Sequence, residues 1–315
     1  MRHRRVTVLG ASGFIGRYIV KHLAHEGAII AAVSRHATDA GFLKPMGDVG
    51  QIELIDADLG SDRALAAVVA QADIVVNTLG ILYERGARTF EAIHARLPVR
   101  IAAAAQQAGV KEIVHLSAMG ASAASASAYA RSKAKGEADL RAAFPDAIVL
   151  RPSLVFGPED DFFNRFGAYA RMLPGMPLIG GGVTRFQPVY VADVAAAAVA
   201  ALKRKEFGRT FELAGPKVYT LKELLELVLR ETGRERNLID VPFAIASLQA
   251  MVLEFLPKPP LTRDQVKLLQ QDNLPAPCAP GLAELGITPT ALELVLPTYL
   301  YRFRRGGRQW RATPA

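Results

Sequence analysis

The chain has 315 residues, 50% of them hydrophobic and 22% charged, with a single cysteine, Cys278. This composition is typical of a globular protein of one large domain or two small ones in a reducing compartment, and it excludes a disulfide framework. The net charge of +8 is carried by the two ends, with three arginines in residues 1–5 and five in residues 298–315. The body between them is formally neutral, which argues against a nucleic-acid-binding groove.

Membrane spans and metal sites are also disfavoured. The best apolar candidate, residues 242–257, contains Gln249 and Glu254 and is shorter than the ~18 residues that a span needs. We predict no transmembrane segment, and no leader peptide because the first strand begins near Arg5. The six histidines show no zinc-like spacing. We therefore expect a bacterial cytoplasmic protein without a metal.

Strands and helices alternate through the first half of the chain. Six apolar stretches predict strands at residues 6–10, 28–35, 51–59, 72–80, 112–118 and 147–158. Helices are predicted between them at residues 14–26, 89–108 and 129–143. Because the strands are continuously apolar, they indicate a parallel sheet covered on both faces. We predict an α/β fold with a Rossmann-type, doubly wound sheet of about seven strands.

The pattern changes after Pro158. Residues 185–191, 192–202 and 210–215 predict a strand, an Ala-rich helix and a strand that continue the first domain, 1–158. Residues 159–185 and 215–305 predict a smaller, mainly helical lobe, and residues 306–315 a basic tail. In that lobe Thr220 and Gly233 are the expected cap and stop of one helix. The acidic run 159–161 is expected to open another helix rather than bind a metal.

The loop GASGFIG connects the first strand to the first helix, and its glycines predict a dinucleotide site. Gly10 permits the tight turn, Gly13 lets the backbone approach a pyrophosphate, and Gly16 lets the helix lie close to the sheet. The free N–H groups of the helix start then bind the phosphates. The same segment supplies further expected cofactor contacts, Ser12, Phe14 and Ile15.

The end of the second strand favours NADP(H) over NAD. An NAD site needs an acid there for the ribose 2′-hydroxyl, but residues 28–38 contain none. Ser34 and Arg35 occupy the place instead, and a guanidinium beside a hydroxyl suits a 2′-phosphate. Arg17 is a possible second cation. The alternative is that Arg35 is solvated and the site binds NAD weakly.

Other polar or small residues end the remaining strands at the same edge. Asp58 either accepts a hydrogen bond from the adenine amino group or caps the helix that begins near Ser61. Because cofactors bind at the carboxyl edge of such sheets, we also expect contacts from Leu59, Thr78, Leu79, Gly80, Ser117, Pro152 and Val155.

Tyr129 and Lys133 are four residues apart, so on a helix they share a face. A nearby cation lowers the pKa of a phenol, which predicts a proton donor or acceptor beside the nicotinamide.

These motifs resemble the extended short-chain dehydrogenase/reductase superfamily from Val6 to about Ala214. GASGFIG, DADL, NTLG, YARSK and LRPSLVFGP stand in the family's order. The resemblance implies that Tyr129 is the catalytic acid/base and that Lys133 binds the nicotinamide ribose. The family's usual catalytic Ser or Thr falls on Ala118, so activity is in question. Three loop serines are possible replacements, Ser122, Ser125 and Ser127.

Three longer strings, at residues 157–166, 177–195 and 259–273, resemble one atypical branch of that superfamily. The branch includes an accessory subunit of respiratory complex I (alpha subcomplex subunit nine) and its bacterial relatives. It implies a tightly bound NADPH without known turnover, and complex I subunits as partners. The alternative is an active NADPH-dependent reductase or epimerase/dehydratase-like enzyme, with a possible link to ubiquinone biosynthesis. The basic ends would bind the complex or an anionic membrane surface, on the inner face of the cell membrane.

Overall fold

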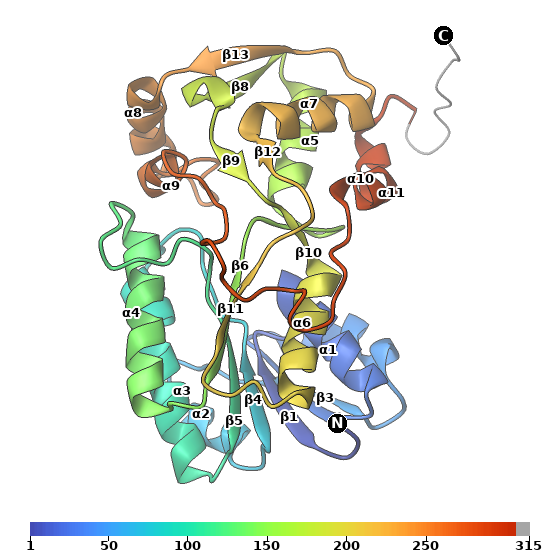
Figure 1. Cartoon of the computed structure of the whole chain (residues 1–315), viewed down its shortest axis with the longest axis vertical. Helices are drawn as coiled ribbons and strands as arrows, with labels where there is room; N and C mark the ends of the chain where they lie inside the picture. The colour runs from blue at the N-terminus through green and yellow to red at the C-terminus, as the bar shows by residue number, and fades with distance from the viewer. Residues whose placement is uncertain (307–315) are drawn as a thin grey trace. The chain divides into compact units, whose positions relative to one another are not determined.

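The computed structural model describes residues 1–306, and the chain separates into two compact units. The first unit comprises Met1–Pro152, Val191–Leu213 and Ala276–Thr288, and the second comprises Ser153–Tyr190, Ala214–Pro275 and the chain from Pro289 onward. Figure 1 follows the chain through both. The tail arginines Arg308 and Arg311 lie outside the described residues.

The first unit is built on a seven-stranded sheet in which every pairing is parallel, in the order β11-β6-β5-β4-β1-β2-β3. This confirms the predicted doubly wound sheet. Strand β1 pairs with both β2 and β4, so the strand order reverses there, and in such sheets ligands bind at the carboxyl edge beside this point. The strands are β1 (Arg5–Leu9), β2 (Ile29–Ser34), β3 (Ile52–Asp56), β4 (Ile74–Asn77), β5 (Glu112–Leu116), β6 (Ile148–Pro152) and β11 (Thr210–Leu213).

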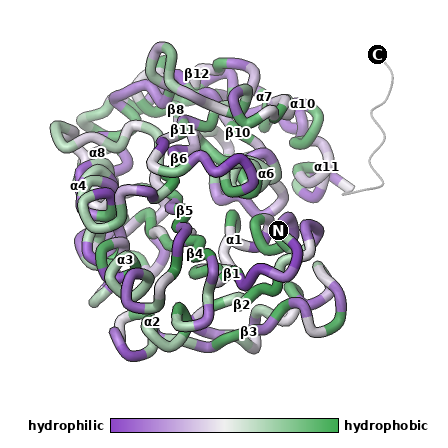
Figure 2. The backbone as a smooth tube through the Cα atoms, turned by 60° about the horizontal axis from the view of Figure 1, so that its bottom comes forward, coloured by the Kyte–Doolittle hydropathy of each residue, from purple (hydrophilic) through white to green (hydrophobic). Residues whose placement is uncertain are grey.

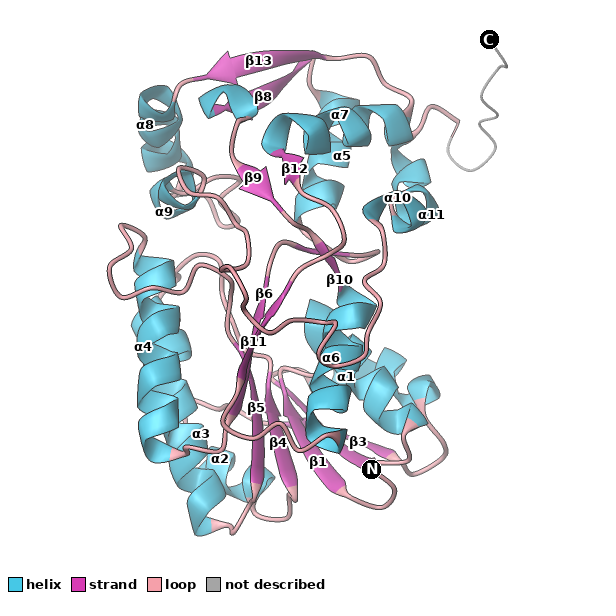
Figure 3. Ribbon diagram, viewed as in Figure 1, coloured by secondary structure: helices cyan, strands magenta, loops and turns pink. Residues whose placement is uncertain are grey.

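Helices cover both faces of this sheet (Figure 3). On one face α1 (Phe14–His25) packs against α6 (Val191–Lys203). On the other face lie α2 (Asp62–Val69), α3 (Leu97–Gln107) and α4 (Ala128–Ala143). Every residue of β4 and β5 is buried, which explains why apolar residues prevail in these strands. Hydrophobic residues likewise prevail in β2 and α6 (Figure 2). A 3-10 segment, η1 (Ala37–Met46), follows β2.

The single helix predicted at residues 89–108 is in fact two segments. A π-helical turn, η2 (Glu91–Arg96), runs directly into α3. Pro98 stands in the first turn of α3 and has no N–H to donate to the carbonyl of His94, four residues earlier. The regular α-helical bonding is therefore interrupted at His94, where the π turn lies.

The second unit combines helices with three two-stranded sheets. Its α7 (Leu221–Thr232) begins with the predicted Thr220 cap, here a capping box with Glu223, and ends at Gly233 with φ +60°. The other helices are α5 (Phe162–Met172), α8 (Phe243–Leu253), α9 (Arg263–Leu268), α10 (Leu292–Val295) and α11 (Pro297–Leu300), with the 3-10 turns η3 (Gly180–Gly182) and η4 (Tyr301–Phe303). The paired strands are β7 (Val155–Phe156) with β10 (Val189–Tyr190), β9 (Arg185–Phe186) with β12 (Tyr219–Thr220), and β8 (Gly175–Ile179) with β13 (Asn237–Val241).

Two predicted strands, at residues 147–158 and 185–191, are each divided in the structure. The first separates into β6 and β7, which belong to different sheets, and the second into β9 and β10. A proline stands at each division, Pro152 and Pro188. Because proline has no N–H, it cannot continue a hydrogen-bonded ladder through its own position.

The basic ends are partly bonded within their own units. Arg4 pairs with Glu112 at 2.9 Å, and the Arg5 guanidinium donates to Gln71 at the amino edge of the sheet. In the second unit Arg302 donates to the carbonyl of Pro158, and Arg304 to that of Glu231. These contacts hold four arginines of the two ends within their own units, and the predicted contact of the basic ends with a partner or a membrane stays a prediction.

Candidate functional site

The loop between β1 and α1 has room only for glycine at its two ends. Gly10 has φ +85°, and a Cβ there would lie 2.8 Å from Thr78 Oγ1. A Cβ on Gly16 would lie 2.2 Å from the Gly10 carbonyl oxygen, while the Gly13 N–H donates to that oxygen at 3.0 Å. The loop is thus a backbone-lined cradle at the start of α1, where free N–H groups attract anions.

The Arg17 side chain is bonded to the backbone of this cradle. Its guanidinium donates to the carbonyl of Ser12 at 3.0 Å and lies 4.6 Å from the ring centre of Phe42. It is therefore a structural cation of the loop as well as a possible phosphate contact. Phe14 and Ile15 form the first turn of α1, and both are half-buried.

Ser34 and Arg35 stand where β2 ends. The Ser34 side chain is buried, and its Oγ has no hydrogen-bond partner among residues 1–306. Arg35 is exposed. An unpartnered buried hydroxyl is costly unless a ligand or water satisfies it. The site therefore has a polar group whose partner is missing from the described chain.

Arg88 is a second cation near Arg35 that sequence analysis missed. Burial lowers the pKa of Arg88, and the positive charge of Arg35 lowers it further. Arg88 lies in the loop after β4, more than fifty positions from Arg35, so no local pattern connects the two. The structure also brings an acid to this edge. Asp56 stands opposite Ser34 in β3, where its carboxylate accepts the N–H of Ala37 at 3.3 Å.

Asp58 does not cap the following helix. Its Oδ1 accepts the N–H of Gly60 at 2.9 Å, while Ser61 is the cap of α2 and accepts from Ala64. The carbonyl of Leu59 accepts a hydrogen bond from Arg100. The proposed adenine contact of Asp58 stays a prediction.

The end of β4 joins the glycine loop to β5 and α4. Thr78 Oγ1 donates to the Leu9 carbonyl at 2.8 Å, and the Leu79 N–H donates to Asn77 Oδ1. At Gly80 a Cβ would lie 3.6 Å from Lys133 Nζ. Residues from the first, fourth and fifth βα connections therefore meet at one edge.

Ser117 follows β5, and its buried Oγ also has no partner among the described residues. The next residue, Ala118, has no hydroxyl. The three loop serines that were possible replacements each accept a local backbone N–H: Ser122 from Ala124, Ser125 from Ser127, and Ser127 from Ala130 as the cap of α4. Their oxygens shape the loop, whereas the Ser117 hydroxyl, like that of Ser34, has no partner among the described residues.

The Tyr129–Lys133 pair lies on α4, but its electrostatics differ from the prediction. Lys133 is buried, its Nζ donates to the Leu116 carbonyl at 3.1 Å, and burial lowers its pKa to about 8. Burial raises the pKa of Tyr129 to about 12. The prediction of a lowered phenol pKa is therefore wrong, because loss of solvent around the phenol decides the direction.

The residues that form this candidate site lie in a part of the chain that matches a known protein family. Residues 6–214 match the NAD dependent epimerase/dehydratase family. The chain belongs to that family. The match covers the glycine loop, β2 with Ser34 and Arg35, and the Tyr129–Lys133 helix, and it confirms the family resemblance of the motifs.

This chain is similar to several named proteins over most of its length. It is 35% identical to NADH dehydrogenase [ubiquinone] 1 alpha subcomplex subunit 9, mitochondrial, of Arabidopsis thaliana, over 98% of this chain and 80% of the relative. The protein of the same name from Mus musculus is 36% identical over 95% and 80%. A ceramide reductase of Caulobacter vibrioides is 29% identical over 75% and 73%.

Solved structures of the family share the fold. The dTDP-glucose 4,6-dehydratase of Streptomyces venezuelae, with NAD and TYD bound, superposes with a TM-score of 0.72 at 20% identity, over 96% of this chain and 98% of that one. At this identity the likeness shows the fold alone.

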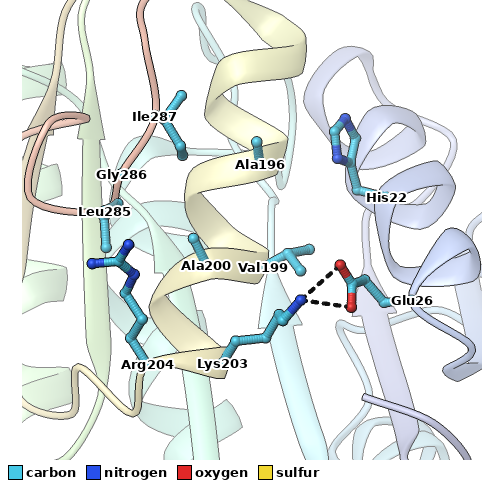
Figure 4. A pocket seen from close by; sticks show the side chains of 10 residues that line it. All are labelled: His22, Glu26, Ala196, Val199, Ala200, Lys203, Arg204, Leu285, Gly286 and Ile287. Atoms are coloured by element: carbon cyan, nitrogen blue, oxygen red, sulfur yellow. Dashed lines mark hydrogen bonds and ion pairs between the residues drawn. The ribbon is translucent and has the colours of Figure 1, made fainter.

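A separate groove in the first unit, with a volume of about 400 Å³, lies between α1, α6 and residues 285–287 (Figure 4). An ion pair between Lys203 and Glu26, at 2.9 Å, is part of its lining. His22 and Glu26 stand near the carboxyl end of α1, whereas the glycine loop adjoins its start. The groove is therefore distinct from the candidate cofactor site. Among residues 1–306 there is no cluster of potential metal ligands and no helix able to cross a membrane.

Proposed function

We propose that this protein binds NADPH at the carboxyl edge of the parallel sheet and acts as an accessory or assembly protein of respiratory complex I, with little or no turnover. The cofactor proposal rests on one observation: a glycine-only cradle beside the unpartnered Ser34 hydroxyl and the exposed Arg35. A 2′-phosphate would satisfy the hydroxyl and the guanidinium together. The 2′-hydroxyl of NADH lacks its usual acceptor, because residues 28–38 contain no acid and Asp56, at the end of β3, accepts the N–H of Ala37.

The remaining residues fit the other parts of a dinucleotide. The N–H groups between Gly13 and Gly16 would bind the pyrophosphate, and Asp58 would accept from the adenine. Lys133 would bind the nicotinamide ribose, and the free hydroxyl of Ser117 would face the nicotinamide side. Arg88 would add a second positive charge to the 2′-phosphate site.

Low turnover follows from the proton donor. Bound NADPH supplies a hydride to a carbonyl substrate, and the protein must then supply a proton. Tyr129 is the candidate donor, but a phenol with its pKa raised to about 12 is a poor acid near neutral pH. No hydroxyl at Ala118 holds the carbonyl oxygen beside it.

The complex I role is supported by the similarity to subunit 9 of two distant eukaryotes over 95% or more of this chain. The second unit also presents an apolar surface that suits attachment, since Leu248, Val252 and Phe255 are 63%, 65% and 89% exposed. We place the protein in a bacterial cytoplasm, peripheral on the inner face of the membrane, in contact with complex I subunits or anionic lipid.

An active NADPH-dependent reductase or epimerase/dehydratase-like enzyme is the second candidate, with ubiquinone biosynthesis as one setting. Tyr129 and Lys133 stand together on α4, and the ceramide reductase of Caulobacter vibrioides is a relative. Under this proposal Tyr129 would donate the proton and Lys133 would orient the ribose.

Three measurements test the proposal. Purified protein should bind NADPH more tightly than NADH in equilibrium titration and should reduce carbonyl substrates slowly or not at all. Tagged protein isolated from host membranes should migrate with NADH:ubiquinone oxidoreductase activity on a native gel. Fast, Tyr129-dependent reduction would favour the second candidate, and absence of NADPH binding would refute both.

A further inference from the structure

His94 is a buried histidine at the centre of the site that no sequence motif points to. It lies in the π turn η2 and is 1% exposed. Its Nε2 lies 3.0 Å from the Ile81 nitrogen, in the loop after β4, and its Nδ1 lies 3.0 Å from Ser132 Oγ on α4. One imidazole therefore joins two segments that both adjoin the Tyr129–Lys133 pair.

The partners of His94 determine its protonation. A backbone N–H only donates, so Nε2 accepts the bond from Ile81. Ser132 has a single hydroxyl proton, which it donates to the Tyr129 carbonyl at 2.7 Å. Ser132 Oγ must then accept from Nδ1–H. The ring is neutral with its proton on Nδ1, and both of its nitrogens are bonded.

The same ring fixes the position of the phenol. Its centroid lies 5.1 Å from that of Tyr129 at an interplanar angle of 86°, an edge-to-face contact. The imidazole also stacks on Phe90 at 5.4 Å and 17°, and Phe90 itself meets Tyr129 edge-to-face at 5.7 Å. Tyr129 is thus held by two aromatic rings in addition to its own helix.

The backbones are equally close here. A Cβ on Gly136 in α4 would lie 1.8 Å from the His94 carbonyl oxygen, so η2 and α4 are in direct contact one turn beyond Lys133. A Cβ on Gly80 would lie 3.8 Å from His94 Nε2 and 3.6 Å from Lys133 Nζ. These distances leave little freedom between the loop, the imidazole and α4.

We propose that His94 is a positioning residue for the nicotinamide half of the cofactor site. It ties the Gly80–Ile81 loop to α4 and holds the Tyr129 ring, so that the loop, the phenol and Lys133 keep one spacing around the nicotinamide ribose. The adenosine half, built from Ser34, Arg35 and the glycine loop, makes no contact with His94. This inference rests on the proposed NADPH site. It adds His94 to that site and assigns it to the nicotinamide half alone.

The test compares two ligands on His94→Phe, which keeps an aromatic ring against Phe90 but removes both nitrogens. NADPH fills both halves of the site, whereas 2′,5′-ADP fills only the adenosine half. We expect His94→Phe to weaken NADPH by about fivefold or more and to leave 2′,5′-ADP within about twofold of the wild type. His94→Gln, whose amide accepts and donates, should restore most of the NADPH affinity.

Equal losses for both ligands, unchanged NADPH affinity, or failure of His94→Gln to recover binding would each overturn the role of His94. Ser132→Ala provides the same comparison if His94→Phe does not fold, since it removes the acceptor of Nδ1–H; it should also weaken NADPH selectively, and an unselective loss would count against the proposal. Failure of the wild type to bind either ligand would instead refute the proposed cofactor site.

Discussion

Replacing Arg35 by alanine should separate the affinities for NADPH and NADH. Arg35 is exposed, and its charge disfavours the charged form of Arg88, so its removal should not lower stability. A hydrogen bond to a charged group contributes about 1.5–3 kcal/mol, which corresponds to a loss of about 10-fold to 150-fold in NADPH affinity. Arg88 remains near the phosphate in the variant and favours the lower end of this range.

The assay is equilibrium titration of both cofactors at low and moderate salt, with the unfolding temperature as a check on the fold. NADH has no 2′-phosphate, so its affinity should change by less than about threefold. The control is Arg63→Ala, an exposed arginine on α2 in the same unit, which should affect neither cofactor. Equal affinities of the wild type for NADPH and NADH, or equal losses for both in Arg35→Ala, would refute the assignment of the 2′-phosphate site.

Three other perturbations address the chemistry, the pH dependence and the tail. Ala118→Ser should raise any residual rate of carbonyl reduction by about tenfold or more, because it restores the hydroxyl that would hold the carbonyl oxygen. An unchanged rate would show that the missing hydroxyl does not limit the reaction. Burial raises the pKa of Asp160 to about 6, so protonation of this carboxyl group favours the folded second unit. The resulting gain in the free energy of unfolding is complete below the unfolded pKa of about 4 and is lost as the pH rises through about 6. In urea unfolding the wild type should therefore gain up to ~3 kcal/mol over Asp160→Asn between about pH 7 and pH 4, and parallel curves would contradict this. Deleting residues 307–315 should keep the fold and the NADPH affinity but weaken salt-sensitive sedimentation with anionic vesicles and host membranes. Deletion from Phe303 onward, whose ring packs against Gly167, should instead lower the unfolding temperature. Equal sedimentation of the full-length protein and the 307–315 deletion would make the tail a solvated end.

Much of the fold and the cofactor loop could be predicted from sequence because the signals are local. The spacing of Gly10, Gly13 and Gly16 is set by one turn and the start of one helix, and the Thr220 cap bonds within four residues. Continuous apolar runs predict buried parallel strands, since both faces of such strands are covered. Ser34 and Arg35 followed from their place at the end of one strand.

The electrostatics of the site depend on contacts between distant segments. Phe90 and His94 reach Tyr129 from residues about 35 to 40 positions earlier, and no spacing in YARSK shows that these rings pack against the phenol. The sign of its pKa shift was therefore wrong from sequence, where only Lys133 was visible. The nearness of Arg88 to Arg35 and the pairing of Arg4 with Glu112 likewise depend on the order of the strands.

The sequence by itself therefore determined most elements of the first unit, the glycine cradle and the family, because turns, caps and periodicity act over a few residues. Only the tertiary structure decided which hydroxyls have no partner, which ring holds Tyr129, and which arginines are already bonded. Those properties depend on desolvation, and desolvation depends on packing between segments that the chain brings together only when the sheet has formed.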